Sequence, residues 1–183
     1  LHPSVQNKSI IQLSGKNQFL ILDTMNFWMD NNLEDLNEVI SKVNLISIND
    51  EEAYLLAKEK SLDNCAYKII NKGPQYVIIK KGELGAELYS KDEKFSFPSF
   101  KVEAIDPTGA GDSFAGGLAT YLSKSNNIDF NSLKKGLILG TILASFTVES
   151  LGTKSIETVV KKKILERLEM FLIKNKIDLN LSI

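Results

Sequence analysis

The chain has 183 residues, of which 43% are hydrophobic and 25% charged, a composition typical of globular proteins and unlike that of disordered or fibrous chains. The 22 basic and 23 acidic side chains nearly cancel, and no lysine-rich face interleaved with aromatic residues is present, so we expect no nucleic-acid partner. One cysteine, Cys65, and one histidine, His2, exclude an intramolecular disulfide framework, a Cys/His zinc site and a histidine-based nucleophilic triad.

Three short apolar runs in the first half of the sequence predict buried strands. They are Gln18–Asp23, Asn44–Ile48 and Tyr76–Ile79. Each is bounded by polar segments, and the third is rich in β-branched residues. A further pair of extended runs, Ala86–Ser90 and Lys94–Phe97, predicts a β-hairpin.

Helical patterns separate these strands. Asn32 is the expected cap of a helix with apolar residues at helical spacing, and Leu62–Lys72 is a second helix ended by Gly73. Asn49, with Glu52 three residues later, forms a capping-box pattern that begins a third. Because strands and helices alternate, the sequence predicts an α/β fold with a parallel sheet.

The second half is predicted to be helical. After Pro98 the chain passes through an apolar segment, Val102–Ile105, which we expect to be a strand ending at the acid Asp106. Three helices follow in the order Gly111–Ser123, Ser132–Val148 and Ser155–Ile173. The last of them has one apolar stripe.

The segment from Asp106 to Gly117, DPTGAGDSFAGG, is the most informative. Glycines allow the backbone N–H groups of Gly109, Ala110 and Gly111 to point at one spot at a helix N-terminus, which favours an anion such as phosphate. Asp112 would face the same spot, where a carboxylate makes sense as a base or a metal ligand. From these residues alone, a tight turn with Asp112 as a helix-start acid is an equal alternative.

The string from Asp106 through Gly117 resembles, residue by residue, the second signature of the ribokinase-like carbohydrate kinases, often called the PfkB family. The resemblance implies an α/β, ribokinase-like three-layer sandwich with a mostly parallel sheet. It implies Asp112 as the catalytic base and Gly109–Gly111 as the anion hole. It also implies ATP as phosphoryl donor, Mg²⁺ as cofactor, and a sugar or nucleoside hydroxyl as acceptor.

Two further segments match the family near its nucleotide phosphates. Asn49 and Glu52 resemble an Asn-x-x-Glu motif that organises Mg²⁺, with Glu52 toward the metal; helix capping is the alternative, and the two roles are compatible. Gly82 and Gly85 resemble a Gly-x-x-Gly turn beside the nucleotide. Where many relatives carry threonine this sequence has Lys80, whose ammonium either reaches a phosphate or remains solvated.

The segment Ala144–Val148, followed by Gly152, resembles the helix and turn that border the adenine, which implies nucleotide contacts by Thr141, Ala144 and Ser145. Many relatives have asparagine near the position of Thr141.

Small residues at Gly136, Gly140 and Ala144 lie four apart on one helical face, which predicts close helix packing or, secondarily, a nucleotide wall. Asp106 and Thr108 lie where some relatives hold a monovalent cation.

Other features limit the alternatives. The segment from Asp23 to Trp28 follows a strand end, where open α/β sheets place ligands, and resembles a segment that often reads Asp-x-Asn-x-Arg in sugar kinases, but no arginine follows. The one arginine, Arg167, lies in the last predicted helix, so we expect lysine, Mg²⁺ or backbone donors to meet the phosphates. P-loop and protein-kinase motifs are absent.

Relatives in the resembled family are longer, and their amino-terminal part supplies strands, much of the substrate site and a lid. We therefore expect residues 1–183 to be a single, incomplete nucleotide-binding and catalytic portion, completed by the amino-terminal part or by association into a homo-oligomer. A nucleotide-binding module without catalysis is the competing interpretation. No apolar run approaches the roughly 20 residues of a membrane span, and Leu1–Asn7 lacks the features of a signal peptide, so we expect a cytoplasmic protein.

Overall fold

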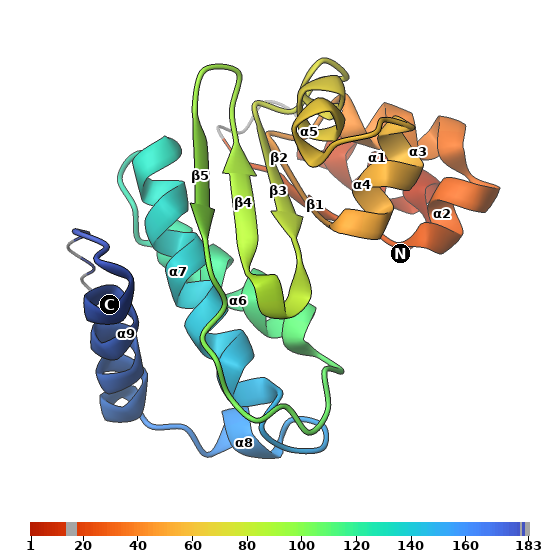
Figure 1. The fold of residues 1–183 in the computed structure, drawn as a ribbon. Helices are drawn as coiled ribbons and strands as arrows, with labels where there is room; N and C mark the ends of the chain where they lie inside the picture. Colours follow the sequence, from red (N-terminus) through yellow and green to blue (C-terminus); the bar gives the residue numbers. More distant parts are fainter. Residues whose placement is uncertain (14–17, 180, 182–183) are drawn as a thin grey trace. The chain divides into compact units, whose positions relative to one another are not determined.

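The computed structural model describes residues 1–13, 18–179 and 181. The chain divides into two compact units, Leu1–Phe97 (unit 1) and Pro98–Ile183 (unit 2). Unit 1 holds a sheet with its helices, and unit 2 is helical (Figure 1). The single domain expected over 1–183 remains a prediction.

The sheet of unit 1 has five strands in the order β1-β2-β3-β4-β5. The strands are β1 (Ile21–Asp23), β2 (Leu45–Asn49), β3 (Tyr76–Lys80), β4 (Ala86–Tyr89) and β5 (Lys94–Phe97). β1, β2 and β3 are parallel, whereas β4 is antiparallel to β3 and β5 to β4. The predicted parallel strands and the predicted hairpin are therefore confirmed, although β1 is shorter than its apolar run.

Apolar residues hold the parallel strands in the interior. Leu45, Ile46 and Ile48 of β2 are fully buried, as are Val77 and its two successors in β3. Such continuous burial is typical of parallel strands covered on both faces. The register pairs Asp23 with Ser47 and Asn49 with Lys80, so the carboxyl ends of the three strands lie at the same edge of the sheet.

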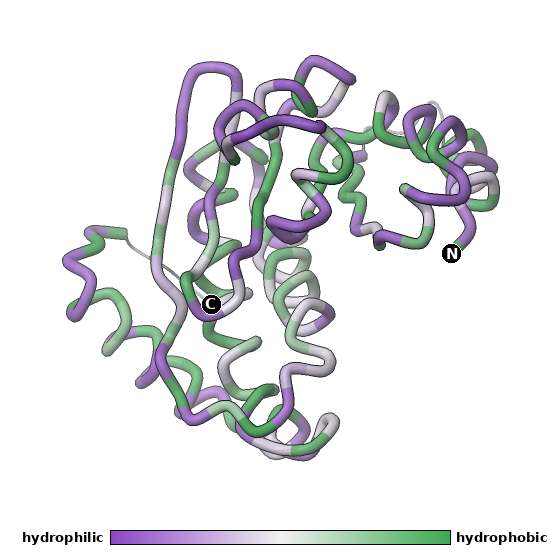
Figure 2. Tube along the Cα trace, turned by 45° about the vertical axis from the view of Figure 1, so that its right-hand side comes forward, coloured by the Kyte–Doolittle hydropathy of each residue, from purple (hydrophilic) through white to green (hydrophobic). Residues whose placement is uncertain are grey.

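Five helices accompany the sheet: α1 (Pro3–Gln12), α2 (Asn26–Asn31), α3 (Leu33–Ile40), α4 (Asp50–Ala57) and α5 (Leu62–Ile70). Hydrophobic and hydrophilic residues alternate along the amino-terminal helices (Figure 2), and the apolar faces of α3 and α5 belong to the core that includes Ile46 and Val77. α3, α4 and α5 confirm the predicted helices, but α1 and α2 were not predicted. Asn32 does precede α3, yet its side chain makes no capping hydrogen bond.

Unit 2 contains α6 (Ala110–Ser123), α7 (Phe130–Thr147), α8 (Lys154–Glu157) and α9 (Lys161–Asn175). The single helix predicted over 155–173 was wrong, because extended backbone at Val160 separates α8 from α9. The strand predicted over 102–105 was also wrong: this segment is irregular, and Ile105 N–H donates to the carbonyl oxygen of Val148. Within the described residues, no helix has the length and hydropathy needed to span a membrane.

Glycines allow α6 and α7 to pack closely. A Cβ atom at Gly140 would lie 2.6 Å from the carbonyl oxygen of Phe114, and one at Gly136 would lie 2.8 Å from Leu118 Cδ1. On the facing helix, a Cβ at Gly117 would lie 2.7 Å from the Cα of Gly140. Because real Cβ atoms do not approach backbone atoms so closely, Gly140 and Gly117 exclude larger residues, whereas at Gly136 the Leu118 side chain could shift. The predicted helix packing is therefore confirmed at Gly140.

Candidate active site

Polar side chains gather where the parallel strands of unit 1 end. Asp23 ends β1, Asn49 ends β2 and Lys80 ends β3. The Nζ atom of Lys80 lies 3.4 Å from Oδ2 and 3.5 Å from Oδ1 of Asp23. This edge of an α/β sheet is where ligands commonly bind. We call Asp23, Asn49, Glu52 and Lys80 the strand-edge cluster.

Asn49 and Glu52 form the predicted capping box at the start of α4. Asn49 Oδ1 accepts from the Glu52 N–H at 2.8 Å, and Glu52 Oε2 accepts from the Asn49 N–H at 2.8 Å. Burial raises the pKa of Glu52, opposed by the Asn49 hydrogen bond and the charge of Lys80. The capping interpretation is therefore confirmed, and because the capping bond uses only Oε2, the second carboxylate oxygen is compatible with a role toward a metal.

The oxygen ligands of the strand-edge cluster fit one mode of Mg²⁺ binding. Mg²⁺ prefers oxygen ligands and usually keeps several waters, taking one or two carboxylates together with substrate phosphates. Within the described residues, no group of three or more acidic, histidine or cysteine side chains could enclose a metal. Glu52 thus suits an ion held mainly by water and phosphate, and not a metal enclosed by protein ligands.

Two buried hydroxyls near the same edge lack partners. Ser47 is paired with Asp23 in the strand register, and its Oγ atom, like Oγ1 of Thr24, has no hydrogen-bond partner among the residues that the structure describes. Buried polar groups normally have one. Sequence reasoning placed Thr24 in the strand-end segment 23–28 but missed Ser47, since the burial of its hydroxyl follows from the tertiary structure.

The turn after β3 is a 3₁₀ helix over Gly82–Leu84. Gly82 has φ 54° and Gly85 has φ 97°, a region that glycine adopts without steric cost. The Lys81 N–H donates to the Gly85 carbonyl at 2.8 Å, which closes the turn. A Cβ at Gly82 would meet nothing within 4 Å, so the backbone there is open to a ligand, as the predicted nucleotide turn requires.

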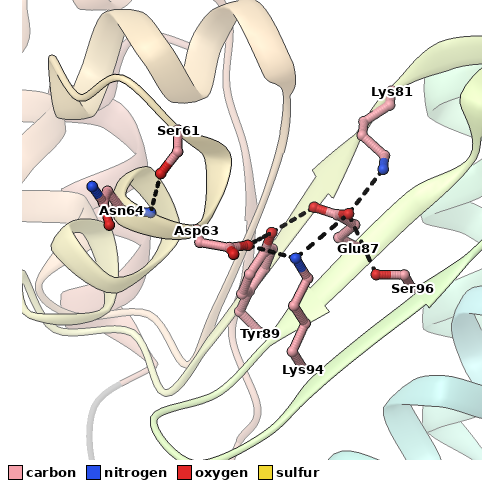
Figure 3. A network of polar contacts seen from close by, with 8 residues as sticks. All are labelled: Ser61, Asp63, Asn64, Lys81, Glu87, Tyr89, Lys94 and Ser96. Atoms are coloured by element: carbon pink, nitrogen blue, oxygen red, sulfur yellow. Dashed lines mark hydrogen bonds and ion pairs between the residues drawn. The ribbon is translucent and has the colours of Figure 1, made fainter.

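Lys81 belongs to a different set of contacts, which the sequence analysis did not identify (Figure 3). Its Nζ atom lies 2.9 Å from Oε1 of Glu87, a side chain only 12% exposed. The Tyr89 hydroxyl lies 2.7 Å from Oδ1 of Asp63 and 2.5 Å from Oε2 of Glu87, so either carboxylate can accept its one proton, and Lys94 pairs with Asp63. Burial, followed by these two carboxylates, raises the pKa of Tyr89 far above its usual range. We call this set, with Ser96, the Tyr89 network.

In unit 2, the glycine-rich turn leads into α6 as predicted. Gly109 is the N-cap with φ 81°, and the first N–H groups of a helix have no carbonyl partner within it. Of the three amides predicted for an anion hole, that of Ala110 donates to the Pro107 carbonyl at 3.2 Å, so the turn itself uses one. Asp112 is exposed in the first turn of α6 and has no hydrogen-bond donor within the described ranges.

The carboxylate of Asp106 accepts two backbone hydrogen bonds at this turn. Its Oδ1 atom accepts from the Thr108 N–H at 2.9 Å, and Oδ2 accepts from the Gly152 N–H at 3.4 Å. These hydrogen bonds, led by that from Thr108, lower the pKa of Asp106. The structure thus gives Asp106 a role in holding the loop after α7, and its predicted role toward a metal remains a prediction.

The residues predicted beside the adenine lie on α7. Thr141 and Ser145 are buried, and Ala144 is partly buried. Ser145 Oγ donates to the Ile142 carbonyl at 2.6 Å and accepts from Arg167 Nη1 at 3.0 Å, so its hydroxyl is already satisfied within the protein. Their nucleotide contacts remain predictions.

The side chain of Arg167 contacts other residues of unit 2. Its guanidinium pairs with Glu149 at 3.0 Å and lies 3.5 Å from the ring centroid of Phe146. Arg167, Glu149 and Phe146 line a cavity of about 480 Å³ beside α9. None of the predicted site residues lines this cavity.

This chain resembles known carbohydrate and nucleoside kinases in sequence. The family model described as pfkB family carbohydrate kinase matches residues 9–159. The chain is 34% identical to a nucleoside kinase from Methanocaldococcus jannaschii over 74% of this chain and 42% of the relative, and 27% identical to an inositol 3-kinase from Arabidopsis thaliana over 75% and 36%.

Solved structures share the ribokinase-like α/β fold. A ribokinase from Thermotoga maritima matches with TM-score 0.69 and 28% identity, covering 90% of this chain and 52% of that one. An aminoimidazole riboside kinase from Salmonella enterica matches with TM-score 0.77 and 22% identity, covering 88% and 56%. The chain therefore spans about half the length of these solved relatives and less of the curated ones. With most of its length matched by the family model, the chain belongs to the pfkB family of carbohydrate kinases.

Proposed function

We propose that this protein transfers the γ-phosphoryl group of ATP to a hydroxyl group of a sugar or a related small molecule. The observation that carries the proposal is Asp112, an exposed carboxylate in the first turn of α6, which begins after the left-handed N-cap Gly109. Because Asp112 has no hydrogen-bond donor within the described ranges, its oxygens are available to accept a proton. Membership of a carbohydrate kinase family supports the reaction class.

Asp112 acts as the general base in this proposal. It removes the proton from the attacking hydroxyl, a contribution of about 10² to 10⁴ in rate. The amides of Gly109 and Gly111 at the N-terminus of α6 stabilise negative charge that develops on phosphoryl oxygens, and the Ala110 amide, which donates to the Pro107 carbonyl, holds the turn between them.

The strand-edge cluster supports the donor nucleotide. Mg²⁺, when bound, neutralises charge on the phosphate oxygens; Glu52 is the residue that would hold it, through water, and Asn49 orients Glu52. Lys80 offers a mobile cation to a phosphate, and the Gly82–Gly85 turn offers open backbone. Thr141, Ala144 and Ser145 border the adenine, and Asp106 is the candidate for a monovalent cation.

The acceptor is a sugar or a nucleoside. Relatives of both kinds match at similar identity, including a ribokinase from Staphylococcus aureus and the nucleoside kinase from Methanocaldococcus jannaschii. Because the chain spans about half the length of its solved relatives, we also propose that it acts with an amino-terminal portion or a second copy. We further propose that it acts in the cytoplasm.

The test uses the full-length product of the gene. Asp112→Asn should leave the affinity for ATP nearly unchanged in calorimetry while ADP formation with an active acceptor falls by about 10² to 10⁴. Asp92→Asn, in the exposed turn between β4 and β5, is the matched control and should retain full turnover. Undiminished turnover in Asp112→Asn would refute the proposed base.

A nucleotide-binding module without catalysis is the second candidate, because the chain covers only part of its relatives. That alternative predicts ATP or ADP binding by the full-length product and no phosphoryl transfer to any sugar or nucleoside in an acceptor screen. Transfer to one acceptor would eliminate it.

A further inference from the structure

The ion pair formed by Lys80 and Asp23 is longer than the pair formed by Lys68 and Glu59 in the same unit. The shortest distance between Lys80 Nζ and the carboxylate is 3.4 Å, compared with 2.8 Å for Lys68 and Glu59. The side chains of Lys80 and Asp23 are 21% and 40% exposed, so solvent and solutes reach both. A long and exposed pair of this kind is easily exchanged for another partner.

The pair bridges the end of the central parallel strand. Asp23 ends β1 and Lys80 ends β3, and β2 lies between them in the sheet. The residue of β2 in register with Lys80 is Asn49, from which α4 and Glu52 continue. An anion that approaches Asn49 and Glu52 therefore meets the Lys80 ammonium while Asp23 is still beside it.

Charges at this edge act on one another. The charge of Lys80 lowers the pKa of Glu52 and that of Asp23 raises it, although burial is the larger influence. The cluster holds one cation and two carboxylates, so Asp23 cancels the charge that would attract a polyphosphate.

We propose that Asp23 is a resident counter-ion of Lys80, which the phosphates of a nucleoside di- or triphosphate must displace. The inference rests on the proposed function and adds a residue that weakens nucleotide affinity. Binding exchanges the Lys80 contact from the Asp23 carboxylate to a phosphate oxygen. Asp23 is thus a positioning residue that acts through Lys80 and makes release of the nucleotide easier.

The experiment is a double-variant cycle of ADP and ATP affinity, measured by calorimetry at low salt with the full-length product. Asp23→Asn should bind ADP about two- to fivefold more tightly, the range expected when an exposed ion partner is removed. Lys80→Met should bind about tenfold more weakly, because it removes a charged phosphate contact. In the double variant the Asp23→Asn gain should disappear.

Glu59→Gln is the matched control, since it removes the carboxylate partner of Lys68 in the same unit, and it should leave ADP affinity unchanged. Melting temperatures separate structural effects: a merely structural Asp23 would lower the melting temperature and give no coupling between positions 23 and 80.

Weaker ADP binding by Asp23→Asn would overturn the inference, as would a gain that persists in the Lys80→Met background, where Asp23 would act by long-range repulsion alone. Binding that is unaffected by Asp23→Asn would also overturn it while leaving the proposed function intact. Absence of ADP and ATP binding in every variant, wild type included, would overturn the proposed function itself.

Discussion

Lys80 and Lys81 are adjacent in the sequence, yet their ammonium groups form ion pairs that differ in length and exposure. Lys81 lies 2.9 Å from Glu87, which also accepts from Tyr89 and Ser96. Lys80 lies 3.4 Å from a half-exposed Asp23. The Tyr89 network satisfies its own groups, whereas the strand-edge cluster leaves a loosely held cation.

The comparison separates structural charge from functional charge. Buried ion pairs depend on their remaining hydrogen bonds, and removal of one partner is costly. The Tyr89 network joins α5 through Asp63 to the hairpin through Glu87, Tyr89 and Lys94, so it fixes the hairpin. The strand-edge cluster lies where the parallel strands end, so it can exchange partners with a ligand.

Removal of Glu87 should produce the largest loss of stability. Glu87→Ala leaves Lys81 without its 2.9 Å partner and should lower the free energy of unfolding by about 3 kcal/mol, measured by urea denaturation. Asp23→Ala at the other region should cost under about 1 kcal/mol. Similar losses for the two variants would remove the distinction between the regions.

The two lysines provide the next test. Lys81→Met should lower the free energy of unfolding by about 1–2 kcal/mol, because it leaves the buried Glu87 carboxylate with fewer donors, and should leave ADP affinity unchanged. Lys80→Met should do the reverse, with little effect on unfolding and a clear loss of ADP affinity. A larger destabilisation by Lys80→Met would contradict the assignment of roles.

The smallest expected effects are on the pH dependence of stability. Glu52 and Glu87 should contribute to it with opposite signs. Burial raises the pKa of Glu52, so the folded state binds a proton more readily, and its contribution to stability declines as pH rises through that raised pKa. Burial also acts to raise the pKa of Glu87, but hydrogen bonds from Tyr89 and Lys81 outweigh it and lower the pKa. Its contribution is therefore present above the unfolded pKa and is lost as pH falls.

Melting temperatures measured between pH 3 and pH 8 test this difference, because this interval spans the ordinary glutamate pKa of about 4.3. Glu52→Gln retains a capping side chain and should gain in melting temperature relative to wild type as pH rises. Glu87→Gln should lose relative to wild type over the same change. Parallel curves for both variants would contradict the two pKa directions.

Local patterns predicted much of the fold. β2, β3 and the capping box of Asn49 and Glu52 follow from runs of a few residues, as does the turn at Gly109. The close packing at Gly140 also followed from spacing within one helix. α2 and the break at Val160 were not predicted, because tertiary structure overrides weak local propensity there.

The candidate site was predicted less completely. The Tyr89 hydroxyl meets Asp63 across 26 positions of sequence, and Lys80 meets Asp23 across 57. No local pattern indicates such pairs, since they depend on strand order and register. The sequence predicted Lys80 as a candidate phosphate ligand, but its partner became visible only in the folded chain.

The central claim is phosphoryl transfer with Asp112 as the base, and the most direct test is transfer of label from γ-labelled ATP to a panel of sugars and nucleosides by the full-length product. We expect wild type to label at least one acceptor and Asp112→Asn to label it about 10² to 10⁴ times more slowly. Equal labelling by the two proteins, or none by wild type with any acceptor, would contradict the account.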